Sequence, residues 1–136
     1  MILFASTFQW QYLFIAVAIG LLFGMILSKR GKIDKSKMSS LSLDEFLSTM
    51  RKGTLVDCRK EDAYKKGKIT GARNYPGRSG VKTSSLRKDV PIFIYDDQGG
   101  SHIEGIAKSY IRGGAVMVYT LKEGYLGYLK RQNKNS

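Results

Sequence analysis

The sequence contains a single cysteine, Cys58, and a single histidine, His102. One cysteine excludes an internal disulfide and is typical of a reducing compartment. One cysteine and one histidine are too few for a zinc site of the usual Cys and His ligand number within one chain. No segment repeats another. The sequence therefore excludes a disulfide-stapled scaffold, a zinc module of this kind and a repeat protein.

Charge is absent from residues 1–28, which hold no Asp, Glu, Lys or Arg. Residues 29–136 therefore carry the whole formal charge of +12. The uncharged part includes an apolar run of 20 residues, Phe8 to Leu27, and a helix of this length spans about 30 Å, the thickness of a bilayer's hydrocarbon core. Trp10 and Tyr12 lie near one end of the run, where aromatic rings prefer the headgroup level. We predict that the first 28 residues are an N-terminal transmembrane anchor.

Basic residues follow the apolar run directly, with five Lys or Arg and one Asp at 29–37. The positive-inside rule then predicts a single-pass protein of the cell membrane, with its N-terminus outside and its C-terminal part in the cytoplasm. A cleaved signal peptide would carry basic residues before the run and a small-x-small cleavage site after it, and this sequence has neither. A buried helix of a soluble protein is disfavoured, because about 100 other residues cannot cover an apolar cylinder. Residues 29–40 are predicted to be a basic juxtamembrane linker.

The cytoplasmic part alternates between helical and strand-like segments. Ser42 and Glu45 have capping-box spacing and predict a helix start, and the apolar runs without polar alternation predict buried strands. The predicted elements, in order, are a helix at 42–50, a strand at 54–58, a helix at 61–66, an extended segment at 69–77, a surface loop at 78–89, a strand at 91–95, a helix ending before Gly113, a strand at 115–121 and a helix at 125–131. This order predicts an α/β fold with a central parallel sheet flanked by helices. The domain is predicted to span 41–132, followed by a polar tail at 133–136.

The stretch IYDDQGGSH, residues 94–102, joins the second predicted strand to a helix. A glycine loop in this place makes an anion cradle, because free backbone N–H groups converge at the helix N-terminus. This loop nevertheless begins with two carboxylates. In parallel sheets, ligands bind beyond the carboxyl ends of the strands, where Asp57 and Cys58 also lie. The loop residues of the candidate site are Asp96, Asp97, Gln98, Gly99, Gly100, Ser101 and His102.

Residues 55–76, LVDCRKEDAYKKGKITGARNYP, resemble the rhodanese-like domains. They are similar to the family pattern Asp-x-Arg, Glu-x-x-Tyr, Gly-x-Ile-x-Gly-Ala-x-Asn-x-Pro, with Lys68 where a His is common. The residues in register are Asp57, Arg59, Glu61, Tyr64, Gly67, Ile69, Gly71, Ala72, Asn74 and Pro76. A second similarity, GGAVMVYTLKEGYLGYL at 113–129, contains the family's closing glycine at Gly124. The resemblance implies a small α/β fold around a central parallel sheet.

The family's active loop usually begins with a cysteine whose sulfur becomes a persulfide, so the resemblance implies sulfur transfer at this loop. Here an acid replaces the cysteine: counting from the strand gives Asp96, and counting back from the end of the following helix leaves Asp97 open. No Lys or Arg lies within the ten residues after Asp97. A carboxylate cannot form the S–S bonds of sulfur transfer. The related phosphatase branch also needs a cysteine, with an Arg where this loop ends in Ser101 and His102. We therefore predict a rhodanese-like domain without the usual catalysis.

Cys58 offers an alternative sulfur carrier, because it too lies at the carboxyl end of a strand. A free cysteine there also fits as a small buried hydrophobe. Arg59 and Lys60 are its only neighbours in sequence that would lower a thiol pKa.

The acidic pair also has two interpretations. Asp96 and Asp97, with His102, would suit a hard cation such as Mg²⁺. Alternatively, the acids cap the following helix and accept loop N–H groups, so that the protein's own carboxylate fills the cradle. We favour the second interpretation and predict neither a metal nor a cofactor.

Eight basic residues at positions 65–88 form a solvated face or, beside a membrane, contact anionic lipid headgroups. They are Lys65, Lys66, Lys68, Arg73, Arg78, Lys82, Arg87 and Lys88. No stacking platform or groove-reading motif accompanies them, so nucleic acid is not predicted as a partner. The sequence thus predicts a membrane-anchored, catalytically silent rhodanese-like domain that acts as a docking or regulatory module for a protein partner. The alternative is a membrane-associated sulfurtransferase that uses Cys58 or a partner's thiol.

Overall fold

The computed structural model describes the backbone of residues 2–28 and 32–136, and the side chains of residues 9–28 and 32–136. Within the predicted linker, residues 29–31 therefore lie outside the described residues. The chain divides into two compact units, Met1–Lys32 and Ile33–Ser136.

The first unit consists of one helix, α1 (Ile2–Ser28). Its segment Gln9–Ser28 is 20 residues long and apolar enough to cross a membrane. Every side chain described in this segment is exposed. The length and composition predicted for Phe8 to Leu27 are thus present in a continuous helix.

The second unit is built on a five-stranded parallel sheet with the order β1-β5-β4-β2-β3, which confirms the predicted α/β fold. Its strands are β1 (Met38–Leu41), β2 (Thr54–Asp57), β3 (Arg73–Asn74), β4 (Ile92–Tyr95) and β5 (Val118–Leu121). Its α-helices are α2 (Leu43–Thr49), α3 (Glu61–Lys66), α4 (Ser101–Arg112) and α5 (Gly124–Asn135). Short 3₁₀ turns lie at η1 (Lys35–Lys37), η2 (Met50–Lys52) and η3 (Ser79–Lys82).

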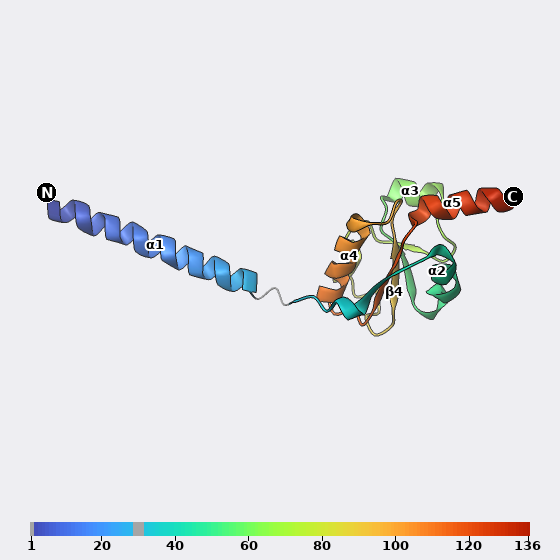
Figure 1. The fold of residues 1–136 in the computed structure, drawn as a ribbon, viewed down its shortest axis with the longest axis horizontal. Helices are drawn as coiled ribbons and strands as arrows, with labels where there is room; N and C mark the ends of the chain where they lie inside the picture. The colour runs from blue at the N-terminus through green and yellow to red at the C-terminus, as the bar shows by residue number, and fades with distance from the viewer. Residues whose placement is uncertain (1, 29–31) are drawn as a thin grey trace. The chain divides into compact units, whose positions relative to one another are not determined.

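The sheet is covered on both faces, as the central strand β4 shows. Ile92 and Ile94 belong to one buried cluster with side chains of α4, whereas Phe93 and Tyr95 belong to another with side chains of α2 and α5. Alternate side chains of a strand point to opposite faces. Figure 1 accordingly shows α4 and α2 on opposite sides of β4. Both clusters consist entirely of residues from the second unit, which therefore has a core of its own.

The four longer strands start in register. Met38 of β1 pairs with Val118 of β5, Val118 pairs with Ile92 of β4, and Ile92 pairs with Thr54 of β2. The segments that precede these parallel strands therefore meet at one edge of the sheet, which we call the N-terminal edge. The segments that follow the strands meet at the opposite, C-terminal edge.

Three predicted boundaries differ from the structure. Met38–Leu41, in and beside the predicted linker, forms the edge strand β1, which has only two apolar residues and owes its conformation to pairing with β5. The predicted surface loop at 78–89 buries Leu86 in the core. The predicted polar tail at 133–136 is mostly helical, because α5 continues to Asn135.

Candidate functional site

The loop between β4 and α4 lies at the C-terminal edge of the sheet. Asp96 follows Tyr95 directly, and α4 begins at Ser101 with Gly100 as its N-cap residue. Gly99 and Gly100 have φ values of 75° and 79°, a region that glycine adopts without steric cost. The two glycines therefore allow the chain to turn back over the end of β4.

Asp96 points into its own loop. Its carboxylate is 7% exposed, and Oδ1 accepts a hydrogen bond from the backbone N–H of Gly99 at 2.6 Å. The other oxygen, Oδ2, lies 3.0 Å from Nδ1 of His102, in the first turn of α4. A carboxylate of the protein thus occupies a loop N–H that an external anion would otherwise bind.

The prediction that the loop acids accept loop N–H groups and cap the following helix is correct in its first part and wrong in its second. The contact between a carboxylate and a loop N–H exists, through Asp96 and Gly99. The predicted helix cap does not, because the N-cap residue of α4 is Gly100 and no side chain caps this end. Asp96 does not cap the helix because it lies five residues before Ser101, the first residue of α4, and its carboxylate accepts the N–H of Gly99 instead.

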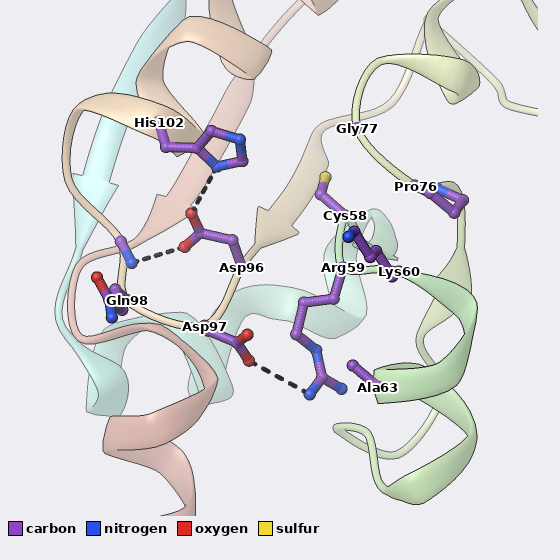
Figure 2. Close-up of a pocket in the computed structure, with 11 residues that line it drawn as sticks. Cys58, Arg59, Lys60, Ala63, Pro76, Gly77, Asp96, Asp97, Gln98 and His102 are labelled. Atoms are coloured by element: carbon purple, nitrogen blue, oxygen red, sulfur yellow. Dashed lines mark hydrogen bonds and ion pairs between the residues drawn. The ribbon is translucent and has the colours of Figure 1, made fainter.

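Asp97 points away from Asp96. Its side chain is 52% exposed, and Oδ1 lies 3.5 Å from Nη1 of Arg59. Figure 2 shows the two carboxylates directed toward different partners, His102 and Arg59. Among the described side chains, no group of three or more His, Cys, Asp or Glu is placed to hold a metal ion. The loop acids therefore do not converge on a common point.

A buried ion pair supports the end of β2 beneath the loop. Asp57 is fully buried and accepts hydrogen bonds from Nη2 of Arg59 and from the hydroxyl of Tyr95, both at 2.8 Å. Burial acts most strongly on the pKa of the Arg59 guanidinium and lowers it, but the hydrogen bonds to Asp57 and the attraction of the surrounding acidic groups together exceed burial and raise that pKa. The guanidinium also lies 3.8 Å from the ring centre of Tyr125, a cation–π distance. Arg59 is therefore held as a permanent cation inside the domain.

The other residues of the predicted motif hold the backbone around this pair. Asn74 donates hydrogen bonds to the carbonyls of Asp57 and Arg59 at 3.1 and 2.9 Å. Tyr64 donates to the carbonyl of Ala72 at 2.7 Å. The remaining motif residues serve as turn, helix and loop positions: Glu61 pairs with Lys65 on the exposed face of α3, Gly67 ends α3, Gly71 has a φ of 91°, and Pro76 lies at the pocket wall. The motif thus builds the frame of the site.

The start of α5 fixes the backbone of the loop, which sequence reasoning did not anticipate. The N–H groups of Tyr125 and Leu126 donate to the carbonyls of Asp96 and Asp97 at 2.7 and 3.1 Å. Gly124 has a φ of 68°, and a Cβ at that position would lie 2.6 Å from the carbonyl carbon of Asp97. The one available signal was the predicted family glycine, because the contact joins segments far apart in sequence.

Cys58 lies beside the loop but is protected from reaction. It is 4% exposed. Burial raises the pKa of its thiol, and the negative charges of Asp57 and Asp96 raise it further. The thiol therefore stays protonated at neutral pH, and the thiolate is the form that reacts.

Loop and strand ends enclose a pocket of about 520 Å³ at the C-terminal edge (Figure 2). Its lining includes the predicted site residues Cys58, Asp96, Asp97, Gln98, Gly99 and His102, together with Arg59 and Pro76 of the family motif. Lys60, Ala63 and Gly77, which sequence reasoning missed, complete the wall, whereas Gly100 and Ser101 do not line it. The pocket wall carries charged side chains of both signs.

Comparison with known proteins identifies the family of this chain. The sequence profile of the rhodanese-like domain matches residues 42–131. Among solved structures, the rhodanese-like domain of the Anabaena protein Alr3790 is 27% identical, with a TM-score of 0.53 over 58% of this chain and 92% of that one. A human single-domain sulfurtransferase is 16% identical, with a TM-score of 0.60 over 68% of this chain and 96% of that one. No curated protein matches the sequence.

A further structural neighbour, from Rhodopseudomonas palustris, is described as a protein of unknown function and possible tyrosine phosphatase. It is 17% identical, with a TM-score of 0.59 over 72% of this chain and 84% of that one. At this identity the likeness concerns the fold alone. The profile match spans more than half of the chain, and the chain therefore belongs to the rhodanese-like domain family, which is related to the sulfurtransferases.

Proposed function

We propose that this chain is a single-pass membrane protein whose rhodanese-like domain does not transfer sulfur and serves in the cytoplasm as a docking or regulatory module. One observation carries the proposal: the carboxylate of Asp96 is bound to the N–H of Gly99 within its own loop. Asp96 is the first residue after β4, and counting from this strand assigns it the position at which the family usually has its cysteine.

The chemistry of this carboxylate argues against sulfur transfer. Sulfur moves between proteins through attack of a thiolate and formation of an S–S bond, and a carboxylate has no sulfur with which to form it. Its negative charge also repels anionic sulfur donors such as thiosulfate. The residue thus removes both the nucleophile and the anion cradle.

The most direct test is the intact mass of the full chain after incubation with a persulfide donor. We expect no added sulfur on the wild-type chain. The variant Asp96→Cys, which places a thiol at the start of the loop, is the positive control, and Asp96→Ser is its matched partner without sulfur. A wild-type chain that gains sulfur would overturn the proposal.

A second candidate function rests on Cys58, which lines the same pocket. A sulfurtransferase using this thiol, or a partner's thiol held in the pocket, would need the cysteine to be exposed and ionised during the reaction. The Cys58→Ser variant separates the two functions. Added sulfur that disappears in this variant would establish Cys58 as the carrier.

The docking role follows from the parts of the pocket that remain accessible. Lys60, Asp97 and Gln98 are exposed at its wall, so a polar protein segment meets charges of both signs there. We expect the substitutions Asp97→Ala and Lys60→Ala to weaken capture of a membrane-protein partner. Lys134→Ala, an exposed change outside the pocket and outside the N-terminal edge of the sheet, is the matched control. Equal capture by all three variants would argue against the pocket as the docking site.

The membrane role follows from the helix Gln9–Ser28 and its basic flank. In sealed membrane vesicles of known orientation, a protease on the cytoplasmic side should digest the domain, whereas a protease on the other side should leave it intact. Release of the full chain by high salt or alkaline carbonate would exclude a membrane-spanning helix.

A further inference from the structure

The charges of the second unit are divided unequally between the two edges of the sheet. The N-terminal edge comprises the segments 34–37, 50–53, 87–91 and 112–117, which together hold seven Lys or Arg and two Asp. The C-terminal edge comprises 42–45, 58–68, 96–100 and 122–123, which together hold six Lys or Arg and seven Asp or Glu. The first edge is therefore strongly cationic, whereas the second is nearly neutral.

Most cations of the N-terminal edge are accessible. Arg51, Lys52 and Arg112 are exposed, and no described carboxylate lies within ion-pair distance of them. The exposed Lys35 and Lys37 belong to η1, directly before β1.

Two further cations of this edge are already engaged. Arg87 pairs with Asp89 in an exposed contact, and Lys88 donates a hydrogen bond to the carbonyl of Gly113. The other five therefore supply the positive charge available to a partner.

An apolar side chain stands among these cations. Val116 is 48% exposed, and its N–H donates to the carbonyl of Lys88 at 3.1 Å. The four segments of this edge contain no aromatic residue. An exposed aliphatic side chain on the same edge as these cations suits a lipid interface, where apolar groups enter the acyl boundary and cations meet headgroups. Nucleic-acid binding would call for aromatic stacking surfaces, which these segments lack.

The chain enters the second unit at this same edge, through the segment that precedes β1. Seven residues lead from Ser28, the last residue of α1, to Lys35, and a chain of seven residues reaches at most about 25 Å. If α1 spans a bilayer, as proposed above, these cations stay close to the headgroups by covalent connection alone. Short tethering of this kind raises the effective concentration of a weak binding surface.

We propose that the N-terminal edge of the sheet is a docking surface for anionic phospholipid headgroups, with Val116 entering the interface. The surface lies opposite the pocket. A bilayer seated on the N-terminal edge therefore leaves the pocket beside Asp96, Asp97 and Cys58 facing the cytoplasm. The proposal rests on the proposed membrane anchor and does not depend on any role of the pocket.

The test uses residues 33–136 and lipid vesicles, because this unit contains both core clusters and no part of the apolar helix. Vesicles of phosphatidylcholine alone are compared with vesicles that contain about a third phosphatidylserine, by co-sedimentation. We expect binding to the anionic vesicles only. Binding should also fall steeply between low and high salt, because salt screens charges beyond a few ångströms.

Two matched double variants locate the surface. Arg51→Glu/Lys52→Glu changes the N-terminal edge, whereas Lys60→Glu/Lys66→Glu makes the same change in net charge at the C-terminal edge. Since each cation near an anionic leaflet contributes about 1 kcal/mol, we expect the first variant to bind at least about tenfold more weakly. The second should stay within about threefold of wild type, because its cations lie away from the leaflet.

A third variant tests a second segment of the N-terminal edge. Lys35→Glu/Lys37→Glu changes another segment of the N-terminal edge and should give a loss of similar size to that of Arg51→Glu/Lys52→Glu. Equal binding to both kinds of vesicle would overturn the proposal. So would equal losses from variants of the two edges, because the total charge of the unit would then account for binding.

Discussion

The two edges of the sheet differ in whether they bury charged side chains. At the C-terminal edge, Asp57 and Asp96 are buried, and hydrogen bonds from Arg59, Tyr95 and Gly99 hold their carboxylates in place. At the N-terminal edge, the charges are mostly lysines and arginines that face solvent. The first edge thus contains buried charged side chains, whereas no charged residue of the four segments at the second edge is buried.

This difference shows that the formal charge of +12 is a poor guide to where the protein attracts anions. A pocket in this family would ordinarily hold an anionic sulfur species. Here the same end of the sheet balances its cations with acids, and the excess of positive charge lies at the other end. Substitutions at the two edges should therefore differ in their effects on the free energy of unfolding.

Arg59 provides the largest expected contrast. Arg59→Ala leaves the buried carboxylate of Asp57 without its cation, and loss of one partner of a buried pair costs about 3–5 kcal/mol in unfolding free energy. Arg51→Ala, at the N-terminal edge, removes an exposed side chain and should leave the unfolding free energy nearly unchanged. Denaturant titration of residues 33–136 measures both. Similar losses from the two variants would contradict the proposed division between the edges.

Two glycines give the next contrast. Gly124 at the C-terminal edge and Gly114 at the N-terminal edge have φ values of 68° and 103°, so alanine is strained at both positions. A Cβ at Gly124 would also collide with the backbone of Asp97, whereas the nearest atom at Gly114 is the Lys88 side chain at 3.7 Å. Gly124→Ala should therefore cost about 1–3 kcal/mol more than Gly114→Ala. Thermal unfolding of the two variants side by side measures this difference, and equal transition temperatures would refute it.

Tyr110, on α4 between the two edges, tests the effect of burial alone. Its hydroxyl is buried without a hydrogen-bond partner among the described residues. Tyr110→Phe should be neutral or stabilising by about 1 kcal/mol, because the desolvated hydroxyl is removed. A clear loss of stability in denaturant titration would show that the hydroxyl has a partner.

The same residue predicts a dependence on alkaline pH. Burial raises the pKa of the Tyr110 phenol and of the Cys58 thiol above their ordinary values of 10.0 and 9.0. Above those values the unfolded chain releases protons that the folded chain retains, so the unfolding free energy should fall as pH rises past 9.0. The fall should be shallower in Tyr110→Phe and in Cys58→Ala. An unfolding free energy that is constant from neutral to strongly alkaline pH would contradict the burial of both groups.

His102 gives the smallest expected effect. Its side chain is 72% exposed although it contacts Asp96. His102→Ala should therefore cost less than about 1 kcal/mol, as for other exposed ion pairs. Asp96 keeps its bond to Gly99 in this variant. A loss comparable to that of Arg59→Ala, measured in the same titration, would show that His102 is part of the buried frame.

The sequence predicts those parts of the fold whose signals are local. The helix expected at 61–66 is α3, and the strand expected at 91–95 contains β4. The edge strand β1 was missed, because the residues MSSL carry no strand pattern of their own and take their conformation from β5. Local patterns predict elements that bury their own apolar residues, but they do not predict elements that depend on a neighbour.

The site shows the same limit. The loop acids and the motif around Asp57 could be found from sequence, and so could the contact between a carboxylate and a loop N–H. The pairing of Asp97 with Arg59 joins residues 38 positions apart, and the cationic edge gathers four separate segments. The basic residues singled out between 65 and 88 include only two of that edge, Arg87 and Lys88, because strand register and not sequence proximity assembles it.

The rate of thiocyanate formation from thiosulfate and cyanide is a direct measure of sulfur transfer by this protein. If the loop lacks a reactive thiolate, as proposed, the purified full chain should give no rate above that of buffer. Steady turnover by the wild-type chain that is lost in Cys58→Ser or Asp96→Ala would show instead that the domain is an active sulfurtransferase.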